Sequence, residues 1–244
     1  MRDKSQKRTP VRFLTVFVAV FGFFAACRLR GDVRLPAVCS DNMILQKGVS
    51  VPIRGWASPS EKVAVDFAGQ RKETAADSAG KWQVLLDPLH VSDASADMRI
   101  TGQNAIVIRN VLVGDVWLAS GQSNMEMPVR NAANAAQEMA SANYPGLRFF
   151  MIERDLSSSP KEDCVGKWVV CEPKSVGPFS AAAYFFAREL HQKYKIPLGV
   201  INSSVGASSC QAWTPAEVLA ADKTLPQLAD LLLGAVVQQA ERAV

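Results

Sequence analysis

The stretch GDVWLASGQSNMEMPV, residues 114–129, decides the fold. Its beginning, DVWLAS, is typical of a short buried strand, and the residues after it are typical of a turn into a helix. Gly121 allows the chain to bend sharply, so we expect the Ser123 hydroxyl to stand at the end of the strand. Free backbone amides beyond the turn can then stabilise an oxyanion. The pattern alone also fits an ordinary helix N-cap at Ser123, with Asn124 as a cap or turn residue.

Strands alternate with helices on the carboxyl side of this stretch. The predicted elements are an alanine-rich helix over 131–143, a strand over 146–153, an amphipathic helix over 179–194 and a strand over 197–206. This alternation predicts a parallel sheet with crossover helices, in which chemistry occurs where strands end in loops at their carboxyl edge. Two loops are expected at that edge, GQSN at 121–124 and SSVGASS at 203–209.

The part before the stretch is rich in short strands. Period-two alternation of apolar residues, with turn signals between the runs, predicts a β-sandwich-like region over 32–112. Trp56 and Trp82 are expected to pack in its core rather than to act as platforms for sugars. The predicted fold class is therefore α/β: an incomplete parallel sheet with flanking helices over 113–244, preceded by the β-rich region.

Composition and charge exclude several classes of protein. Among 244 residues, 48% are hydrophobic and 20% are charged, which excludes a disordered chain, a collagen-like fibre and a small disulfide scaffold. The net charge of +4 comes from the first 26 residues, because the remainder holds 22 basic and 22 acidic side chains. A neutral body gives no support for nucleic-acid binding.

Residues 1–27, MRDKSQKRTPVRFLTVFVAVFGFFAAC, are predicted to be a secretory leader. A basic front precedes an apolar run that is short for a membrane span and ends in small residues. Cys27 behind Phe-Ala-Ala resembles a lipoprotein acceptor, and a single uncleaved anchor helix is the alternative. We therefore expect an exported protein that is periplasmic, secreted or attached to a membrane through lipidation of Cys27.

The cysteines fit an oxidising compartment. The five are Cys27, Cys39, Cys164, Cys171 and Cys210. An odd number fits one cysteine lost to processing or lipidation and four that can pair, with Cys164 and Cys171 as one candidate local bridge. The chain has no Cys-x-x-Cys pair and only two histidines, so a zinc site is not expected.

Residues 114–129 resemble the nucleophile block of the sialate O-acetylesterases, a family of the SGNH-hydrolase superfamily. The likeness covers about residues 32–217 and includes the order of its pieces. The other pieces are DVRLPAVCSDNMILQ at 32–46, GWASPSEKVAVDFAGQ at 55–70, and the stretch from WVVCEPKSVGPFS to SSVGASSCQAW at 168–213.

The resemblance implies that Ser123 is the catalytic serine, which attacks an acetyl carbonyl and becomes acylated. Its own backbone amide would be one donor to the oxyanion. Gln122 and Asn124 would orient the acyl oxygen or the turn. The implied partner is an acetylated sugar, and no residue is singled out for binding it.

The loop at 203–209 matches the place of a Gly-Gly-Thr turn that supplies a further oxyanion donor in the family. Gly206 keeps the first glycine, whereas Ala207 and Ser208 replace the other two residues. Alanine permits a close backbone approach if its φ is negative, and a requirement for positive φ would demand a different loop. Trp213 matches a family aromatic, for which core packing and sugar contact both remain open.

A general base is missing from the pattern. In the superfamily, a histidine from an Asp-x-x-His block near the end of the catalytic domain deprotonates the serine. His191 lies on a predicted helix behind Arg188, and Asp87-Pro-Leu-His90 precedes the nucleophile in the β-rich region. We interpret the Asp87–His90 spacing as chance, and the chain as an amino-terminal part of a longer enzyme.

Three functions fit these observations. The first is an exported esterase that removes O-acetyl groups from sialic acid or a related sugar through a serine acyl-enzyme. The second is an inactive fragment that binds glycans or proteins, which the missing base favours. The third is an acetylxylan-type polysaccharide esterase, which shares the nucleophile block.

Overall fold

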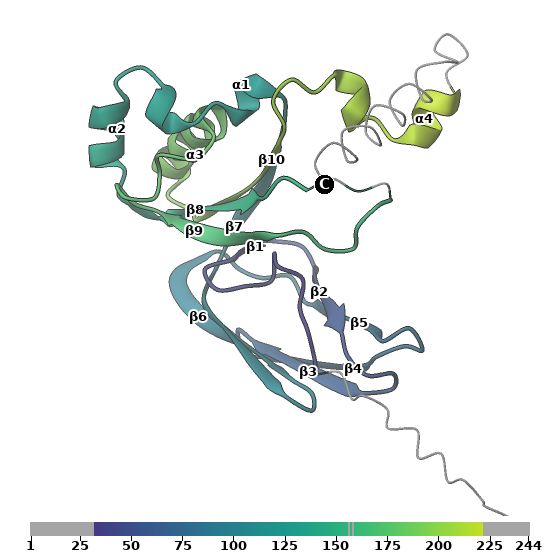
Figure 1. Ribbon diagram of the computed structural model, residues 1–244. Helices are drawn as coiled ribbons and strands as arrows, with labels where there is room; N and C mark the ends of the chain where they lie inside the picture. Colours follow the sequence, from purple (N-terminus) through teal and green to yellow (C-terminus); the bar gives the residue numbers. More distant parts are fainter. Residues whose placement is uncertain (1–31, 156, 158, 222–244) are drawn as a thin grey trace, which may run out of the picture. The chain divides into compact units, whose positions relative to one another are not determined.

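The computed structural model describes residues 32–155, 157 and 159–221 (Figure 1). The strands are β1 (Ile44–Gln46), β2 (Val51–Trp56), β3 (Lys62–Phe67), β4 (Gln70–Ala75), β5 (Lys81–Leu86), β6 (Ser92–Thr101), β7 (Ala105–Gly121), β8 (Tyr144–Ile152), β9 (Gly166–Cys171) and β10 (Leu198–Ser204). The helices are α1 (Ser123–Glu126), α2 (Ala135–Ser141), α3 (Ala181–Tyr194) and α4 (Ala216–Ala221), with 3-10 turns η1 (Val129–Asn131) and η2 (Cys210–Trp213). An eight-stranded sheet has the order β4-β3-β6-β7-β10-β8-β9 with β1 also on β7, and β2 pairs with β5 in a second sheet.

The β-rich region consists of two sheets that share one buried core. Val63 and Val65 on β3 and Ile53 on β2 are each almost completely buried in the same cluster. Trp82 on β5 is also buried there, as expected, because alternate side chains of a strand point to the same face. The predicted sandwich-like pairing is therefore present. The domain boundary between 112 and 113 stays a prediction, since β7 runs through it without a break.

Strand β7 joins the two halves of the large sheet. Its first part pairs antiparallel with β6, and residues Asp115–Gly121 pair parallel with Leu198–Ser204 of β10. The prediction of a short buried strand at 115–120 is wrong, because these residues end a longer strand and Trp117 and Leu118 are 45% and 69% exposed. The reason is that β1 pairs with β7 only as far as Gly114, and no other described strand continues along that edge.

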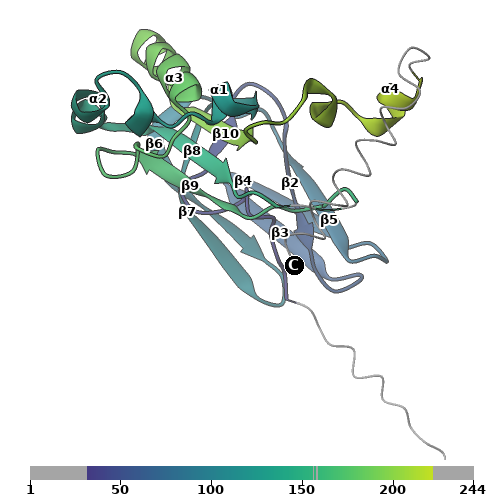
Figure 2. The same ribbon diagram turned by 45° about the horizontal axis from the view of Figure 1, so that its top comes forward.

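The carboxyl half of the sheet has an α/β arrangement. Strands β7, β10 and β8 are parallel, whereas β9 runs antiparallel to β8 at the edge, so the sheet is mixed and not wholly parallel as predicted. Helices α1, α2 and α3 lie together over this part of the sheet in both views (Figures 1 and 2). On β9, Trp168 donates its Nε1–H to the carbonyl of Val38, which ties the sheet to the segment before β1. The predicted α/β class with flanking helices is confirmed.

The alanine-rich segment differs in its boundaries. We predicted one helix over 131–143, but η1 ends at Asn131 and α2 begins only after Asn134, whose φ of 57° interrupts the helical backbone. By contrast, α3 begins only two residues after the predicted start and ends at Tyr194 as predicted, with the Ser180 hydroxyl accepting a hydrogen bond from the amide of Ala183.

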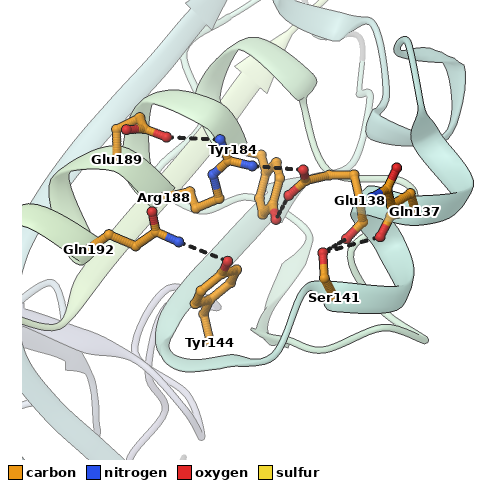
Figure 3. Close-up of polar contacts among 8 residues, drawn as sticks. All are labelled: Gln137, Glu138, Ser141, Tyr144, Tyr184, Arg188, Glu189 and Gln192. Carbon is orange, nitrogen blue, oxygen red and sulfur yellow. Dashed lines mark hydrogen bonds and ion pairs between the residues drawn. The ribbon is translucent and has the colours of Figure 1, made fainter.

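Polar contacts fasten α2 to α3 (Figure 3). Glu138 on α2 accepts hydrogen bonds from the Tyr184 hydroxyl and from Arg188 on α3, the latter at 2.7 Å. Burial alone would raise the pKa of Glu138, but the hydrogen bonds from Tyr184 and Arg188 outweigh it and lower the pKa. The carboxylate therefore contributes to the packing of the two helices as an anion.

Cys39, Cys164, Cys171 and Cys210 are all free thiols, so the expected pairing is absent among them. Burial raises the pKa of Cys171 to about 12, which keeps it a protonated, unreactive thiol. The leader with Cys27 lies outside the described residues, and within them no helix is long and apolar enough to cross a membrane.

Candidate active site

Ser123 lies directly after the end of β7. Gly121 has a φ of +142°, a value that side chains rarely tolerate, so the glycine provides the sharp turn that the sequence predicts. Gln122 is the N-cap of α1 and Ser123 is its first helical residue, which excludes the N-cap interpretation of the serine. Ser123 is exposed, and its Oγ donates a hydrogen bond to Oε1 of Gln122 at 2.8 Å.

The loop after β10 meets the serine. Parallel pairing places Ser204 opposite Gly121, and the amide of Val205 donates to the carbonyl of Gly121 at 2.9 Å. A Cβ atom at Gly206 would lie 3.7 Å from the Cβ of Ser123. Both views show α1 and the carboxyl end of β10 side by side (Figures 1 and 2). The two loops that we expected at the carboxyl edge are thus in contact.

The Gly206 amide already has an acceptor. It donates a hydrogen bond to Oε2 of Glu126 at 2.8 Å, while Oε1 of Glu126 pairs with Arg154. The sequence reasoning missed Glu126, although its place three residues after Ser123 puts both side chains on one face of the helical turn. An acyl oxygen could use the Gly206 amide only in competition with this carboxylate.

Ala207 adopts a left-handed backbone conformation with a φ of 62°. The condition of a negative φ at this alanine is therefore not met, and the loop keeps the positive φ that a glycine would adopt without strain. For a residue with a Cβ atom this conformation costs about 1–2 kcal/mol. Ala207 is exposed, and its amide donates to no acceptor in the described part of the chain.

Trp213, on the 3-10 turn η2, forms a hydrogen bond with the same loop. Its Nε1–H donates to the Ser208 hydroxyl at 2.9 Å, and that hydroxyl in turn donates to the carbonyl of Val205 at 2.6 Å. The indole is 39% exposed, so burial in a core does not account for it. Trp213 thus supports the loop and still offers part of its ring to solvent.

Gln122 and Asn124 flank the serine on the surface. Gln122 accepts the hydrogen bond of the Ser123 hydroxyl, and the Asn124 side chain makes no hydrogen bond within the described residues. Their proposed roles in orienting an acyl oxygen stay predictions.

Neither histidine is near Ser123. His191 lies near the carboxyl end of α3, with Nδ1 2.6 Å from the carbonyl oxygen of Ile196, just before β10 begins. Ser123 lies beyond the other end of the paired strands, and seven residues of β10 span about 20 Å. His90 is exposed between β5 and β6, where the Asp87 carboxylate pairs with Lys72 at 2.7 Å.

Metal ligands do not gather in the described ranges. No group of three or more histidine, cysteine, aspartate or glutamate side chains is placed there to hold a metal ion.

Comparisons with known proteins find acetylesterases that are similar to this chain. No family model matches the chain. Sialate O-acetylesterase from Homo sapiens is 30% identical over 208 residues, 77% of this chain and 40% of the relative, and the one from Pongo abelii is 29% identical over the same shares. The solved structure of a carbohydrate acetylesterase from Xanthomonas citri is 37% identical with a TM-score of 0.75, over 78% of this chain and 44% of that one. The chain thus spans about two fifths of the length of these curated relatives.

Proposed function

Because this chain belongs to the sialate O-acetylesterase family of the SGNH-hydrolase superfamily, we propose that it forms part of an exported carbohydrate esterase. Its reaction removes O-acetyl groups from sialic acid or a related acetylated sugar. The observation that carries the proposal is the exposed Ser123, which follows β7 and lies against the loop around Gly206.

The reaction proceeds in two steps through an acetyl-serine. The Oγ of Ser123 attacks the acetyl carbonyl, its proton passes through a general base to the sugar oxygen, and the carbon–oxygen bond to the sugar breaks. Water then attacks the acetyl-serine, releasing acetate and restoring the hydroxyl. Backbone amides beside the serine stabilise the negative charge on the carbonyl oxygen in both steps. The chemistry requires no cofactor.

The general base is not one of the two histidines of this chain. The hydroxyl of Ser123 has only the Gln122 amide oxygen as an acceptor among the described residues, and an amide oxygen does not take up a proton at neutral pH. By resemblance to the superfamily, the base comes from an Asp-x-x-His block of the catalytic domain, whereas the one Asp-x-x-His spacing of this chain, Asp87–His90, lies in the β-rich region.

Added imidazole provides a test, because it can replace a missing histidine side chain. We expect the chain alone to release acetate slowly from p-nitrophenyl acetate or O-acetylated sialic acid, with Ser123→Ala changing that rate little. With imidazole, acetate release from the acetylated sugar should rise in the unaltered chain and not in Ser123→Ala. Using a sugar acetate avoids the direct attack of imidazole on activated esters. Equal rates for both proteins at every imidazole concentration would argue against the esterase.

Two alternatives are distinguished by the same assay. An inactive module that binds glycans or proteins, favoured by the distance of both histidines from Ser123, should show no serine-dependent release under any condition. An acetylxylan-type esterase should release acetate from acetylated xylan in preference to acetylated sialic acid.

Export rests on the leader. A basic start, a short apolar run and Cys27 support secretion to the periplasm or outside, or lipid attachment. Fractionation of producing cells, with Cys27→Ser as the comparison, tests which of these applies.

A further inference from the structure

We propose that Glu126 is a positioning residue for this esterase, and that the Ala207 amide, not the Gly206 amide, is the loop's donor to the acyl oxygen. The proposal rests on the proposed function and deepens it. It starts from the hydrogen bond between the Gly206 amide and Oε2 of Glu126, two residues 80 positions apart in the chain.

Glu126 connects three segments through one carboxylate. It belongs to α1 together with Ser123, its Oε2 accepts from the Gly206 amide at 2.8 Å, and its Oε1 pairs with Arg154, which follows β8. Hydrogen bonds with an ionised partner are shorter and stronger than those between neutral groups. The carboxylate therefore fixes the loop after β10 in one position relative to the serine.

The glycine at 206 is required by this contact. A Cβ atom there would clash with Oε2 of Glu126, so any other residue would push the carboxylate away from the amide. The same atom would lie 3.7 Å from the Cβ of Ser123. The hydrogen bond between the Glu126 carboxylate and the Gly206 amide, called the Glu126 clamp below, is therefore close to the nucleophile. We therefore attribute this glycine to the Glu126 clamp rather than to direct contact with substrate.

An amide bonded to a carboxylate is a poor donor for a second acceptor. The next amide, that of Ala207, has no acceptor among the described residues. Ala207 has a left-handed φ of 62°, and hydrogen bonds hold the residues before and after it in place. Glu126 holds the residue before it, and Trp213 holds the residue after it through Ser208. These contacts leave the Ala207 amide as a free backbone donor on the residue after Gly206, which itself lies close to Ser123.

Glu126 itself does not serve as the base. The Ser123 hydroxyl donates to Gln122 and not to Glu126, whose two oxygens are held by Arg154 and by the Gly206 amide. Its role is therefore exerted through the loop.

Two variants and one control test the clamp. Glu126→Gln keeps an oxygen that can accept from the Gly206 amide but loses the charge, and Glu126→Ala loses both. Glu153→Ala removes an exposed carboxylate next to Arg154 that makes no hydrogen bond or ion pair in the described structure. Circular dichroism and thermal unfolding establish that each variant is folded.

The first measurement is amide hydrogen exchange over residues 204–209. Glu126→Ala should accelerate exchange of the Gly206 amide at least about tenfold, Glu126→Gln should have a smaller effect, and Glu153→Ala none. Unchanged exchange in Glu126→Ala would overturn the clamp whatever the activity of the protein.

The second measurement is covalent modification by a fluorophosphonate in imidazole buffer, in which the serine oxygen displaces fluoride and the phosphoryl oxygen uses the oxyanion donors. Removing one oxyanion donor lowers kcat about 100-fold to 1000-fold in established enzymes. A donor that is still present but no longer fixed in position should therefore lower the rate constant for modification of Glu126→Ala at least about tenfold. The concentration for half-saturation should change little, and Glu126→Gln should be intermediate.

The outcomes separate the two proposals. Faster exchange with an unchanged modification rate would overturn the positioning role and leave the esterase intact. Equal modification of the unaltered chain and of Ser123→Ala would overturn the esterase, and the positioning role with it.

Discussion

At the scale of single residues, the site depends on two backbone conformations with positive φ. Gly121 turns the chain at the end of β7, and Ala207 holds a positive φ in the facing loop. Glycine adopts a positive φ without strain, whereas alanine does not. The loop after β10 therefore keeps a shape that favours glycine at the cost of strain in its own sequence.

Replacing Ala207 with glycine should relieve that strain. We expect Ala207→Gly to raise the free energy of unfolding by about 1 kcal/mol, because glycine adopts a positive φ without a Cβ penalty. Urea-induced unfolding followed by circular dichroism measures the change.

Ala182→Gly is the matched control, since Ala182 is exposed in the helix α3. There the same substitution should lower the free energy of unfolding by about 0.5–1 kcal/mol. A loss of stability of equal size in both variants would contradict the account of strain at Ala207.

At the scale of elements, the packing of α2 on α3 depends on an ionised carboxylate. Glu138 is reached by Tyr184 and Arg188 from one face of α3, and Arg188 also pairs with Glu189 at 2.8 Å (Figure 3). A helix as short as α2 is not stable by itself, so these contacts and its apolar neighbours hold it.

Acid should loosen this pair of helices. The pKa of Glu138 is lowered in the folded protein, so its contribution to stability is complete above the ordinary glutamate pKa of about 4.3 and is lost as the pH falls through the lower folded value. Tyr184→Phe removes one of the hydrogen bonds and should cost about 1 kcal/mol at neutral pH, with a smaller further loss in acid.

Unfolding in urea at neutral and acidic pH measures both effects. Tyr194→Phe is the control, because Tyr194 is an exposed residue at the end of the same helix. If Tyr184→Phe and Tyr194→Phe respond identically to acid, the carboxylate does not have the role that we assign to it.

At the scale of the whole molecule, a buried arginine connects the β-rich region with the α/β part. Arg148 on β8 is 3% exposed and donates to the carbonyls of Asn42 and Asn110, from the segment before β1 and from β7. Burial lowers the pKa of Arg148 to about 10, so the guanidinium remains charged at neutral pH. Its donors satisfy backbone carbonyls where the two regions meet.

The parts of the fold that follow from local pattern could be predicted. Alternating apolar residues such as Val63 and Val65 gave the β-rich strands, and the Gly121–Ser123 turn gave the position of the serine. The course of β7 could not be predicted, because the exposure of Trp117 and Leu118 depends on which strands lie beside them. The Glu126–Gly206 bond was missed because it is a tertiary contact between α1 and the loop after β10, two segments 80 residues apart in the chain.

The most direct test of the central claim is to look for the acetyl group on Ser123. A missing base slows both steps, but p-nitrophenolate is a far better leaving group than the serine oxygen. Acetyl-serine should therefore form faster than water removes it and should accumulate during long incubation with p-nitrophenyl acetate. Peptide mass mapping of the quenched protein should then find one acetyl group on the Ser123 hydroxyl, and none at that position in Ser123→Ala. An unmodified Ser123, with acetyl groups only on lysines or elsewhere, would contradict the claim that this serine is the nucleophile.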